Sequence, residues 1–171
     1  MGYRVRVIVA DGHSSDSTCE IAEKMGAEII LQNGSIGKGN GVRGALKEIF
    51  SSPVHEGDLV IMLDADATYN PEDLPRFVRE LNDSDVVWGS RLRGNIERKA
   101  MSSTNLIGNK ILSLAASIIF MKRTTDLCTG YWGFRKTSLK ELRLVASGFS
   151  LEADLFGTIA MSGMRTKEIP I

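Results

Sequence analysis

The segment Leu59-Val60-Ile61-Met62-Leu63-Asp64-Ala65-Asp66 decides which fold this chain can adopt. Its run of apolar residues is typical of a strand that is covered on both faces, as in the parallel sheets of α/β proteins. Because side chains two residues apart point to the same side of an extended backbone, Asp64 and Asp66 can face one hard cation, Mg²⁺ or Mn²⁺. The alternative is a solvated turn whose acids only cap the helix that follows.

The sequence on either side of this segment alternates strands with helices. Ser17-x-x-Glu20 forms a capping box, and Asn70-Pro71-Glu72-Asp73 supplies an N-cap with proline at the first helical position. Such alternation with short connections predicts an α/β, Rossmann-like fold: a mostly parallel sheet with helices on both faces. The predicted strands cover 5–10, 27–31, 59–63, 85–88, 131–135 and 166–171, and the predicted helices 17–25, 42–50, 74–81, 106–118, 139–145 and 151–161.

Length and charge exclude several classes of protein. The 171 residues suit one domain, and 21 basic against 21 acidic residues give a net charge of zero. A nucleic-acid binder usually carries a basic surplus, so we expect no nucleic-acid partner. The longest apolar stretch, 111–121, is about half of what a bilayer span needs, and the first residues lack the layout of a signal peptide. Two cysteines without framework or metal spacing fit a reducing compartment, so we expect a cytoplasmic protein.

Three strand ends carry the residues that could perform chemistry. Asp11-Gly12, the Asp64/Asp66 pair and Gly89-Ser90-Arg91 each follow a predicted strand, and ligands of open α/β sheets gather at that edge. Asp11 could accept a hydrogen bond from the N–H of a uracil or guanine base, or only cap its own turn. Arg91 could pair with phosphate as a planar fork, or be an ordinary surface arginine.

Further candidates lie in a glycine-rich loop and in the second half. Lys38 stands between two glycines before a helix, an arrangement that binds phosphate, although an exposed loop lysine fits equally well. Asp126 and Arg135 flank a glycine turn at 130, which is a possible acceptor site. Glu152 and Asp154 lie at the start of a predicted helix, where acids also simply complement the helix dipole.

The ordered set of motifs resembles family 2 glycosyltransferases of the GT-A fold, in particular the polyprenyl-phosphate (dolichyl-phosphate) mannose and glucose synthases. The order and spacing match along nearly the whole chain, which makes the set far more specific than any one motif. The matching segments are 9–18 (VADGHSSDST), 37–41 (GKGNG), 63–74 (LDADATYNPEDL), 89–91 (GSR), 108–109 (GN), 126–135 (DLCTGYWGFR) and 168–171 (EIPI).

The resemblance implies roles for the candidate residues. Asp11 would contact the base of a GDP- or UDP-linked sugar, Lys38 would lie near the nucleotide, and Asp64 with Asp66 would hold Mg²⁺ or Mn²⁺ on its diphosphate. The further roles would be acceptor or sugar-phosphate binding by Arg91 and Arg135, and catalysis by Glu152, Asp154 and Asp126. An inverting transfer of a hexose is implied, with a polyprenyl phosphate as the leading acceptor, at the cytoplasmic face of a membrane.

Three departures from the family pattern bear on function. The chain begins at what is the second strand of these relatives, it ends before their basic loop, and Thr68 stands where many mannose synthases have glutamine. We therefore expect a single GT-A domain, 1–171, that is incomplete at both ends. Two other functions stay open: a nucleotidyltransferase that makes nucleotide sugars, and a non-catalytic remnant that only binds a nucleotide.

Overall fold

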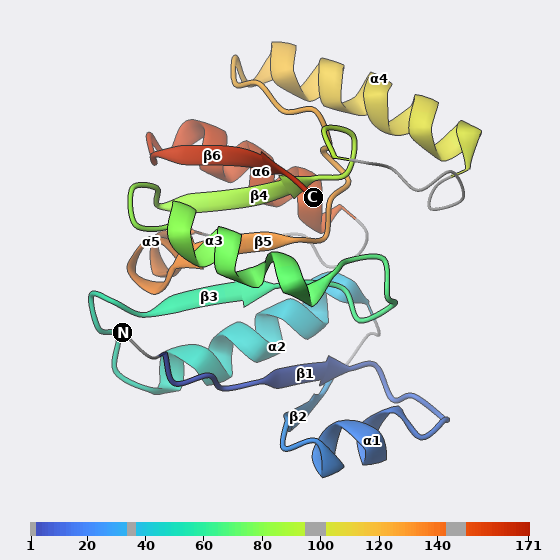
Figure 1. Ribbon diagram of the computed structural model, residues 1–171, viewed down its shortest axis with the longest axis vertical. Coiled ribbons are helices and arrows are strands. Elements are labelled where there is room, and N and C mark those ends of the chain that lie inside the picture. Colours follow the sequence, from blue (N-terminus) through green and yellow to red (C-terminus); the bar gives the residue numbers. More distant parts are fainter. Residues whose placement is uncertain (1–2, 34–36, 95–101, 143–149) are drawn as a thin grey trace. The chain divides into compact units, whose positions relative to one another are not determined.

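The computed structural model describes residues 3–33, 37–94, 102–142 and 150–171, and these form two compact units (Figure 1). Unit 1 comprises Met1–Pro53 with Leu144–Leu151, and unit 2 comprises Val54–Arg143 with Glu152–Ile171. Parts of two predicted segments lie outside the described residues: 34–36 of the glycine-rich loop and 143–145 of the helix predicted over 139–145. The α/β class predicted from the sequence is confirmed.

Unit 1 is a parallel strand pair with two helices. Its elements are β1 (Ile8–Asp11), α1 (Thr18–Lys24), β2 (Glu28–Leu31) and α2 (Lys38–Ser51). The strands pair in parallel, with Ile8 opposite Glu28 and Asp11 opposite Leu31. The predicted capping box is wrong in detail: the side chain of Ser17 makes no capping bond, and Asp16 accepts from the backbone N–H of Thr18 instead. An acceptor at the preceding position satisfies one of the same free N–H groups.

Unit 2 is built on a mixed four-stranded sheet in the order β3-β5-β4-β6. Three strands run in one direction and β5 runs against them, antiparallel to both β3 and β4. The strands are β3 (Leu59–Met62), β4 (Val86–Ser90), β5 (Trp132–Arg135) and β6 (Thr166–Pro170). The helices are the 3-10 helix η1 (Pro71–Asp73), α3 (Leu74–Glu80), α4 (Ser103–Ile119), α5 (Lys136–Glu141) and α6 (Leu151–Met161).

Aromatic side chains of β5 alternate between the two faces of this sheet. Tyr131, just before the strand, stacks on Phe77 of α3 with ring centroids 4.1 Å apart. On the other face Trp132 packs beside Trp88, which meets Phe156 of α6 edge to face. Figure 1 shows α3 and α6 on opposite faces of the sheet. Because successive strand residues point to opposite faces, this short strand joins both halves of the core.

Helix α4 buries small and polar residues and exposes large apolar ones, which is the reverse of an ordinary surface helix. Its buried positions are Asn109, Ser113 and Ala116, whereas Ile111 and Ile118 are more than 60% exposed. The helix begins at an N-cap, Ser102, whose hydroxyl accepts from the backbone N–H of Asn105. Within the described residues, no helix combines the length and the apolar character that crossing a bilayer requires.

Candidate functional site

The carboxyl ends of β3 and β4 meet the start of β5, and the segment before β5 closes this edge of the sheet. Met62 and Trp88 both pair with Trp132, so the residues after β3 and β4 lie close to the turn that ends at Gly130. A Cβ atom added at Gly130 would overlap the carboxylate of Asp64. The absence of a side chain at Gly130 therefore leaves space for the carboxylate of Asp64.

The two acids predicted as metal ligands lie just beyond the strand rather than within it. β3 ends at Met62; the carboxylate of Asp64 is half-buried, while Asp66 is exposed. One oxygen of Asp66 accepts from the backbone N–H of Thr68, 3.0 Å away, in a bend where Ala67 has a φ of 62°. The predicted reason for their pairing, an extended backbone, therefore does not apply to the stretch that contains Asp66.

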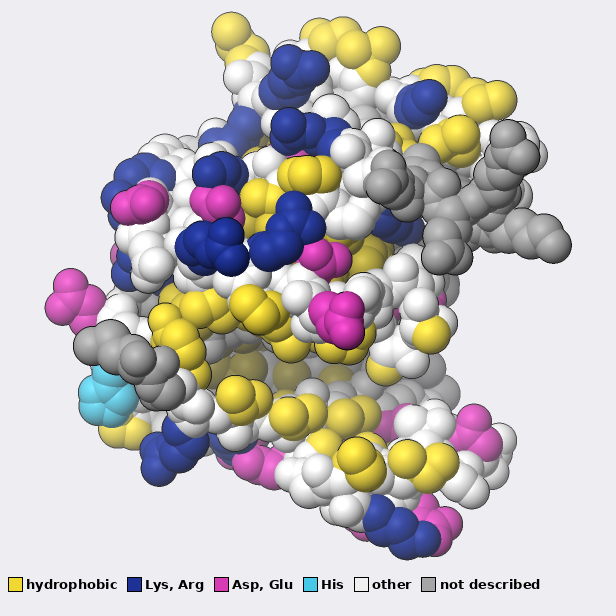
Figure 2. Space-filling model, in the orientation of Figure 1, with side chains coloured by type: hydrophobic (Ala, Val, Ile, Leu, Met, Phe, Trp, Pro, Cys, Tyr) yellow, Lys and Arg dark blue, Asp and Glu magenta, His cyan; other side chains and the backbone are white. Residues whose placement is uncertain are grey.

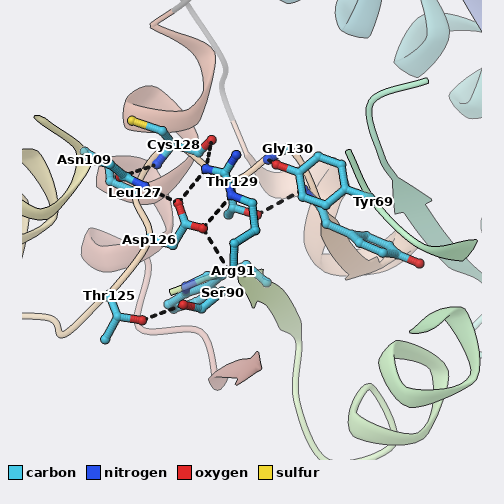
Figure 3. Close-up of polar contacts among 12 residues, drawn as sticks. Tyr69, Ser90, Arg91, Asn109, Thr125, Asp126, Leu127, Cys128, Thr129 and Gly130 are labelled. Carbon is cyan, nitrogen blue, oxygen red and sulfur yellow. Dashed lines mark hydrogen bonds and ion pairs between the residues drawn. The ribbon is translucent and has the colours of Figure 1, made fainter. Parts of the chain in front are cut away.

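Arg91, at the end of β4, is held by the buried carboxylate of Asp126 (Figure 3). Its Nε donates to Oδ2 and its Nη2 to Oδ1, each at 2.8 Å, and its backbone N–H donates to Oδ2 at 3.0 Å. Nη2 also reaches the carbonyl of Cys128, and Asn109 donates to the same carboxylate at 2.6 Å. A two-pronged pair of this kind fixes both the position and the plane of the guanidinium.

The predicted role of Asp126 in catalysis remains a prediction, but its contacts favour positioning. The carboxylate is fully buried and surrounded by donors from Arg91 and Asn109. A general base has to reach a proton on its substrate, and this geometry points both oxygens at the protein instead. Nη1 of Arg91 has no hydrogen-bond partner within the described residues, so it is the part of the pair that can meet an anion.

Burial and charge shift the pKa values of the groups around this pair. Burial opposes the charge of Arg91, but the hydrogen bonds and attraction of Asp126 outweigh it and keep the pKa of the guanidinium above its ordinary value. Burial raises the pKa of Tyr69, whose ring lies 5.7 Å from the guanidinium carbon. The hydroxyl of Tyr69 accepts from the backbone N–H of Gly130, so this tyrosine ties the Asp64 side of the edge to the Arg91 side.

Glu168 of β6 supports the same edge of the sheet, because it joins β4 to the segment that precedes Asp126. It accepts from the indole of Trp88 at 3.0 Å, from the backbone N–H of Thr125 at 2.7 Å and from both threonine hydroxyls at 124 and 125. Thr125 in turn pairs with the hydroxyl of Ser90, one residue before the arginine. Tyr69, Asn109 and Glu168 were assigned no role from the sequence; their only signal was their place inside the motifs that carried the resemblance.

Glu152 and Asp154 occupy the first turn of α6, where both side chains are half-buried. The pKa of the Cys128 thiol is raised by burial first, then by Asp126 and, more weakly, by Glu152, while Arg91 lowers it. Glu152 is therefore within electrostatic reach of Cys128, whose carbonyl accepts from Arg91. Their predicted catalytic roles are not tested by these contacts and remain predictions.

Arg135 lies at the opposite edge of the sheet from Asp64 and Arg91. It pairs with Leu59, the first residue of β3, and donates to the backbone carbonyls of Asn82 and Ser84. The resemblance assigned Arg135, together with Arg91, to the acceptor or sugar-phosphate side. The antiparallel direction of β5 separates them, so the structure does not bring the two arginines together.

The nucleotide candidates of unit 1 lie at the ends of its own elements. Asp11, the last residue of β1, is nearly buried and accepts from the backbone N–H and the hydroxyl of Ser14 at 2.8 and 2.6 Å. These bonds, the hydroxyl first, lower the pKa of the Asp11 carboxyl, so it stays ionised. Lys38 is the first residue of α2, after Gly37, whose N–H donates to Gln32.

The residues after β3 fit a hard divalent cation. Asp64 and Asp66 offer carboxylate oxygens, the ligand type that Mg²⁺ and Mn²⁺ prefer, and Gly130 leaves the space beside Asp64 clear of side chain. Within the described residues no three His, Cys, Asp or Glu side chains cluster, so the protein would supply only part of the coordination shell. Diphosphate oxygens and water would complete it, as is usual for Mg²⁺.

Comparison with known protein families shows to which family this chain belongs. The model of glycosyl transferase family 2 matches residues 1–143. The chain belongs to this family. Relatives within it include glycosyltransferase AglJ of Haloferax volcanii, 34% identical over 165 residues that make up 96% of this chain and 52% of the relative. The chain thus spans about half the length of AglJ.

Two further family 2 relatives carry names that state a lipid-linked reaction. A dolichyl-phosphate hexose transferase of Haloferax volcanii is 34% identical over 98% of this chain and 69% of its own length. An undecaprenyl-phosphate mannosyltransferase of Micrococcus luteus is 28% identical over 96% of this chain and 70% of its own.

The family 2 fold is also that of a solved enzyme. Glucosyl-3-phosphoglycerate synthase of Mycobacterium tuberculosis, in complex with Mn²⁺, UDP and phosphoglyceric acid, superposes with a TM-score of 0.72 at 20% identity. The match covers 96% of this chain and 57% of the synthase. The predicted GT-A fold is confirmed, and membership of a glycosyltransferase family removes the nucleotidyltransferase alternative.

Proposed function

We propose that this family 2 chain transfers a hexose from a nucleoside-diphosphate sugar to a polyprenyl-phosphate acceptor of the dolichyl-phosphate class. The observation that carries the proposal is the carboxyl edge of unit 2, where Asp64 lies against the bare backbone of Gly130 and Tyr69 links Gly130 to Arg91. This edge combines oxygen ligands for a cation with a fixed cationic group. The names of two relatives, which state dolichyl- and undecaprenyl-phosphate reactions, support the acceptor class.

The donor would place its diphosphate at this edge. Asp64 and Asp66 would hold Mg²⁺ or Mn²⁺, which when bound neutralises the charge that builds on a departing diphosphate. Nη1 of Arg91 would meet a phosphate oxygen, while Asp126 keeps the rest of the guanidinium fixed. Because the arginine is already oriented before the substrate arrives, little reorganisation is needed in the transition state.

The transfer itself is a single displacement. An oxygen of the acceptor phosphate forms a bond to the anomeric carbon as the bond from that carbon to the diphosphate breaks, and the nucleoside diphosphate leaves with the electron pair. A phosphate oxygen is ionised at neutral pH and needs no base. A hydroxyl acceptor would need one, and Glu152, half-buried in the first turn of α6, would be the first candidate.

Unit 1 would bind the nucleoside. The carboxylate of Asp11 stays ionised and could accept from the N–H of uracil or guanine in addition to Ser14, since each carboxylate oxygen can accept two hydrogen bonds. Lys38, at the start of α2, would contribute positive charge for binding the nucleotide, and the helix dipole adds to it.

Calorimetric titration tests the donor site. We expect UDP or GDP to bind with Mn²⁺ and at least about tenfold more weakly without it, a difference of about 1.4 kcal/mol. Asp64→Asn keeps the shape but removes the charge, so it should abolish the effect of the metal. The matched control is Asp83→Asn, an exposed acid of the same unit, which should leave the titration unchanged. Binding that is indifferent to Mn²⁺ contradicts the metal site.

A transfer assay separates an enzyme from a non-catalytic remnant. Radiolabelled UDP-glucose and GDP-mannose are offered with dolichyl phosphate, and label is measured in the organic phase. Label that depends on Mn²⁺ and on Asp64 supports the proposal. Tight nucleotide binding without any transfer would instead favour a remnant that binds the nucleotide only.

A further inference from the structure

Helix α4 and the residue two positions after it carry an apolar stripe that faces away from the protein. Its side chains are between 59% and 93% exposed, and those within the helix recur at spacings of three and four, which places them on one side of it. The stripe consists of Ile107, Ile111, Leu114, Ile118 and Met121. Figure 2 shows hydrophobic side chains gathered over α4 at the surface. A contiguous exposed apolar surface usually marks an interaction site.

The hydrogen bonds on the inward side of α4 explain why the helix cannot rotate about its axis to bury the apolar stripe. Asn109 donates to Asp126 and Ser113 donates to Asn109, while the Ser113 hydroxyl accepts from the backbone N–H of Leu127. These bonds hold the polar stripe against the Arg91–Asp126 pair. Rotation of the helix would break them and leave buried groups unsatisfied, so the apolar side must stay outward.

Positive charge surrounds the stripe. Lys110 lies on α4 and Lys122 and Arg123 follow it, whereas α4 contains no acidic residue. The chain as a whole has no net charge, so this surplus is local. Arg123 also lines a pocket of about 320 Å³ with Arg93 and Lys167, where Glu168 is the lining carboxylate. An occupant of this surface is therefore expected to be apolar and anionic.

A second copy of the chain fits this surface poorly. If two α4 helices paired through the stripe, Lys110 would flank it on both helices and Lys122 would follow each helix, and no acid of the helix would offset them. An anionic lipid surface offsets the charge and covers the apolar side at once. Helix α4 has 17 residues, is about 26 Å long and is apolar on its exposed side while its inward side is polar, so we expect it to lie in the plane of the interface.

We propose that α4 docks this protein on an anionic phospholipid bilayer, with the apolar stripe in the headgroup boundary and the basic residues on lipid phosphates. The surface would bring the site to the lipid acceptor of the proposed function, and in that sense it rests on that function. Docking is measured without donor or turnover, however, so either proposal can fail while the other stands.

Vesicle flotation tests the docking surface. The full chain is mixed with vesicles of phosphatidylcholine alone or with phosphatidylglycerol added. We expect binding to the mixed vesicles that weakens with salt, and at least about tenfold weaker binding to phosphatidylcholine alone. The triple variant Ile111→Gln, Leu114→Gln, Ile118→Gln should lose at least about tenfold in affinity. Circular dichroism checks that it folds, which exposed positions should allow.

A matched control and a second measurement keep the test decisive. Ile21→Gln with Met25→Gln changes exposed apolar residues at α1 and should leave flotation unchanged. Leu114→Trp should show a blue-shifted emission when mixed vesicles are added. Unchanged flotation of the triple variant overturns the proposal, as does equal binding to both vesicle types. A lipid-free dimer that the triple variant converts to monomer would assign the stripe to a second copy instead.

Discussion

At the scale of single residues, the site depends on one glycine. Gly130 has no side chain at the point where a Cβ would meet the carboxylate of Asp64, and its N–H donates to Tyr69. A methyl group there must displace either the carboxylate or the turn that leads into β5. The position therefore couples the predicted metal ligand to Tyr69, whose ring lies against Arg91.

Gly130→Ala is expected to weaken Mn²⁺-dependent nucleotide binding at least about tenfold and to lower the free energy of unfolding by about 1–3 kcal/mol, the usual cost of overpacking. Calorimetry with UDP or GDP and urea unfolding measure the two effects. Gly108→Ala in α4 is the control: nothing lies within 4 Å of its Cβ, and alanine favours helix, so stability should hold or rise. Nucleotide binding by Gly130→Ala at the wild-type level would contradict the role given to this glycine.

At the scale of elements, β5 and α3 form the joint on which the site is built. Phe77 of α3 is fully buried, stacks on Tyr131 and lies 3.0 Å from where a Cβ of Gly133 would be. Phe77→Ala should therefore lower the free energy of unfolding by about 3–5 kcal/mol, as measured by urea denaturation. Arg79→Ala, on the exposed side of the same helix, should change it by no more than about 0.5 kcal/mol. Equal effects of the two changes would contradict this packing.

The elements also show what hydrophobic patterns can and cannot predict. The run at 59–63 and the cap at Asn70 predicted β3 and the helical turn after it, because burial and local hydrogen bonds are written into neighbouring residues. Neighbouring residues do not determine the direction of β5, because an apolar run has the same pattern in a parallel and in an antiparallel strand. Arg135, which the resemblance assigned with Arg91 to the acceptor or sugar-phosphate side, lies at the opposite edge.

Helix α4 illustrates the same limit in another way. The sequence predicted a helix over 106–118, and a helix is present over Ser103–Ile119. Periodicity shows that a helix has two sides but not which side faces the protein. The answer lies in distant partners, since Asn109 contacts Asp126 and Ser113 contacts Leu127. The sequence predicted candidate residues for the site, but the hydrogen bonds among them could be derived only from the fold.

At the scale of the whole molecule, acid stability follows from carboxylates in both units. Ser14 lowers the pKa of Asp11 in unit 1, and hydrogen bonds from Arg165 lower that of Asp85 in unit 2. A carboxyl whose pKa is lower in the folded state binds protons more tightly when unfolded, so its contribution is complete above the unfolded value of about 4 and is lost as the pH falls through the folded value. The free energy of unfolding should therefore decrease below about pH 4.

Unit 2 allows this prediction to be resolved to one pair. Both tryptophans of the chain, Trp88 and Trp132, are buried in unit 2, so their fluorescence during urea unfolding reports that unit. Asp85→Asn should flatten the acid dependence, because it removes a carboxylate that receives two side-chain bonds and one backbone bond from Arg165. Arg165→Gln should flatten it in part, since the backbone bond remains, and the double variant should match Asp85→Asn alone. Flattening in the double variant that equals the sum of the two single effects would show that the arginine and the aspartate act independently, and would contradict the pair as the cause of the lowered pKa of Asp85.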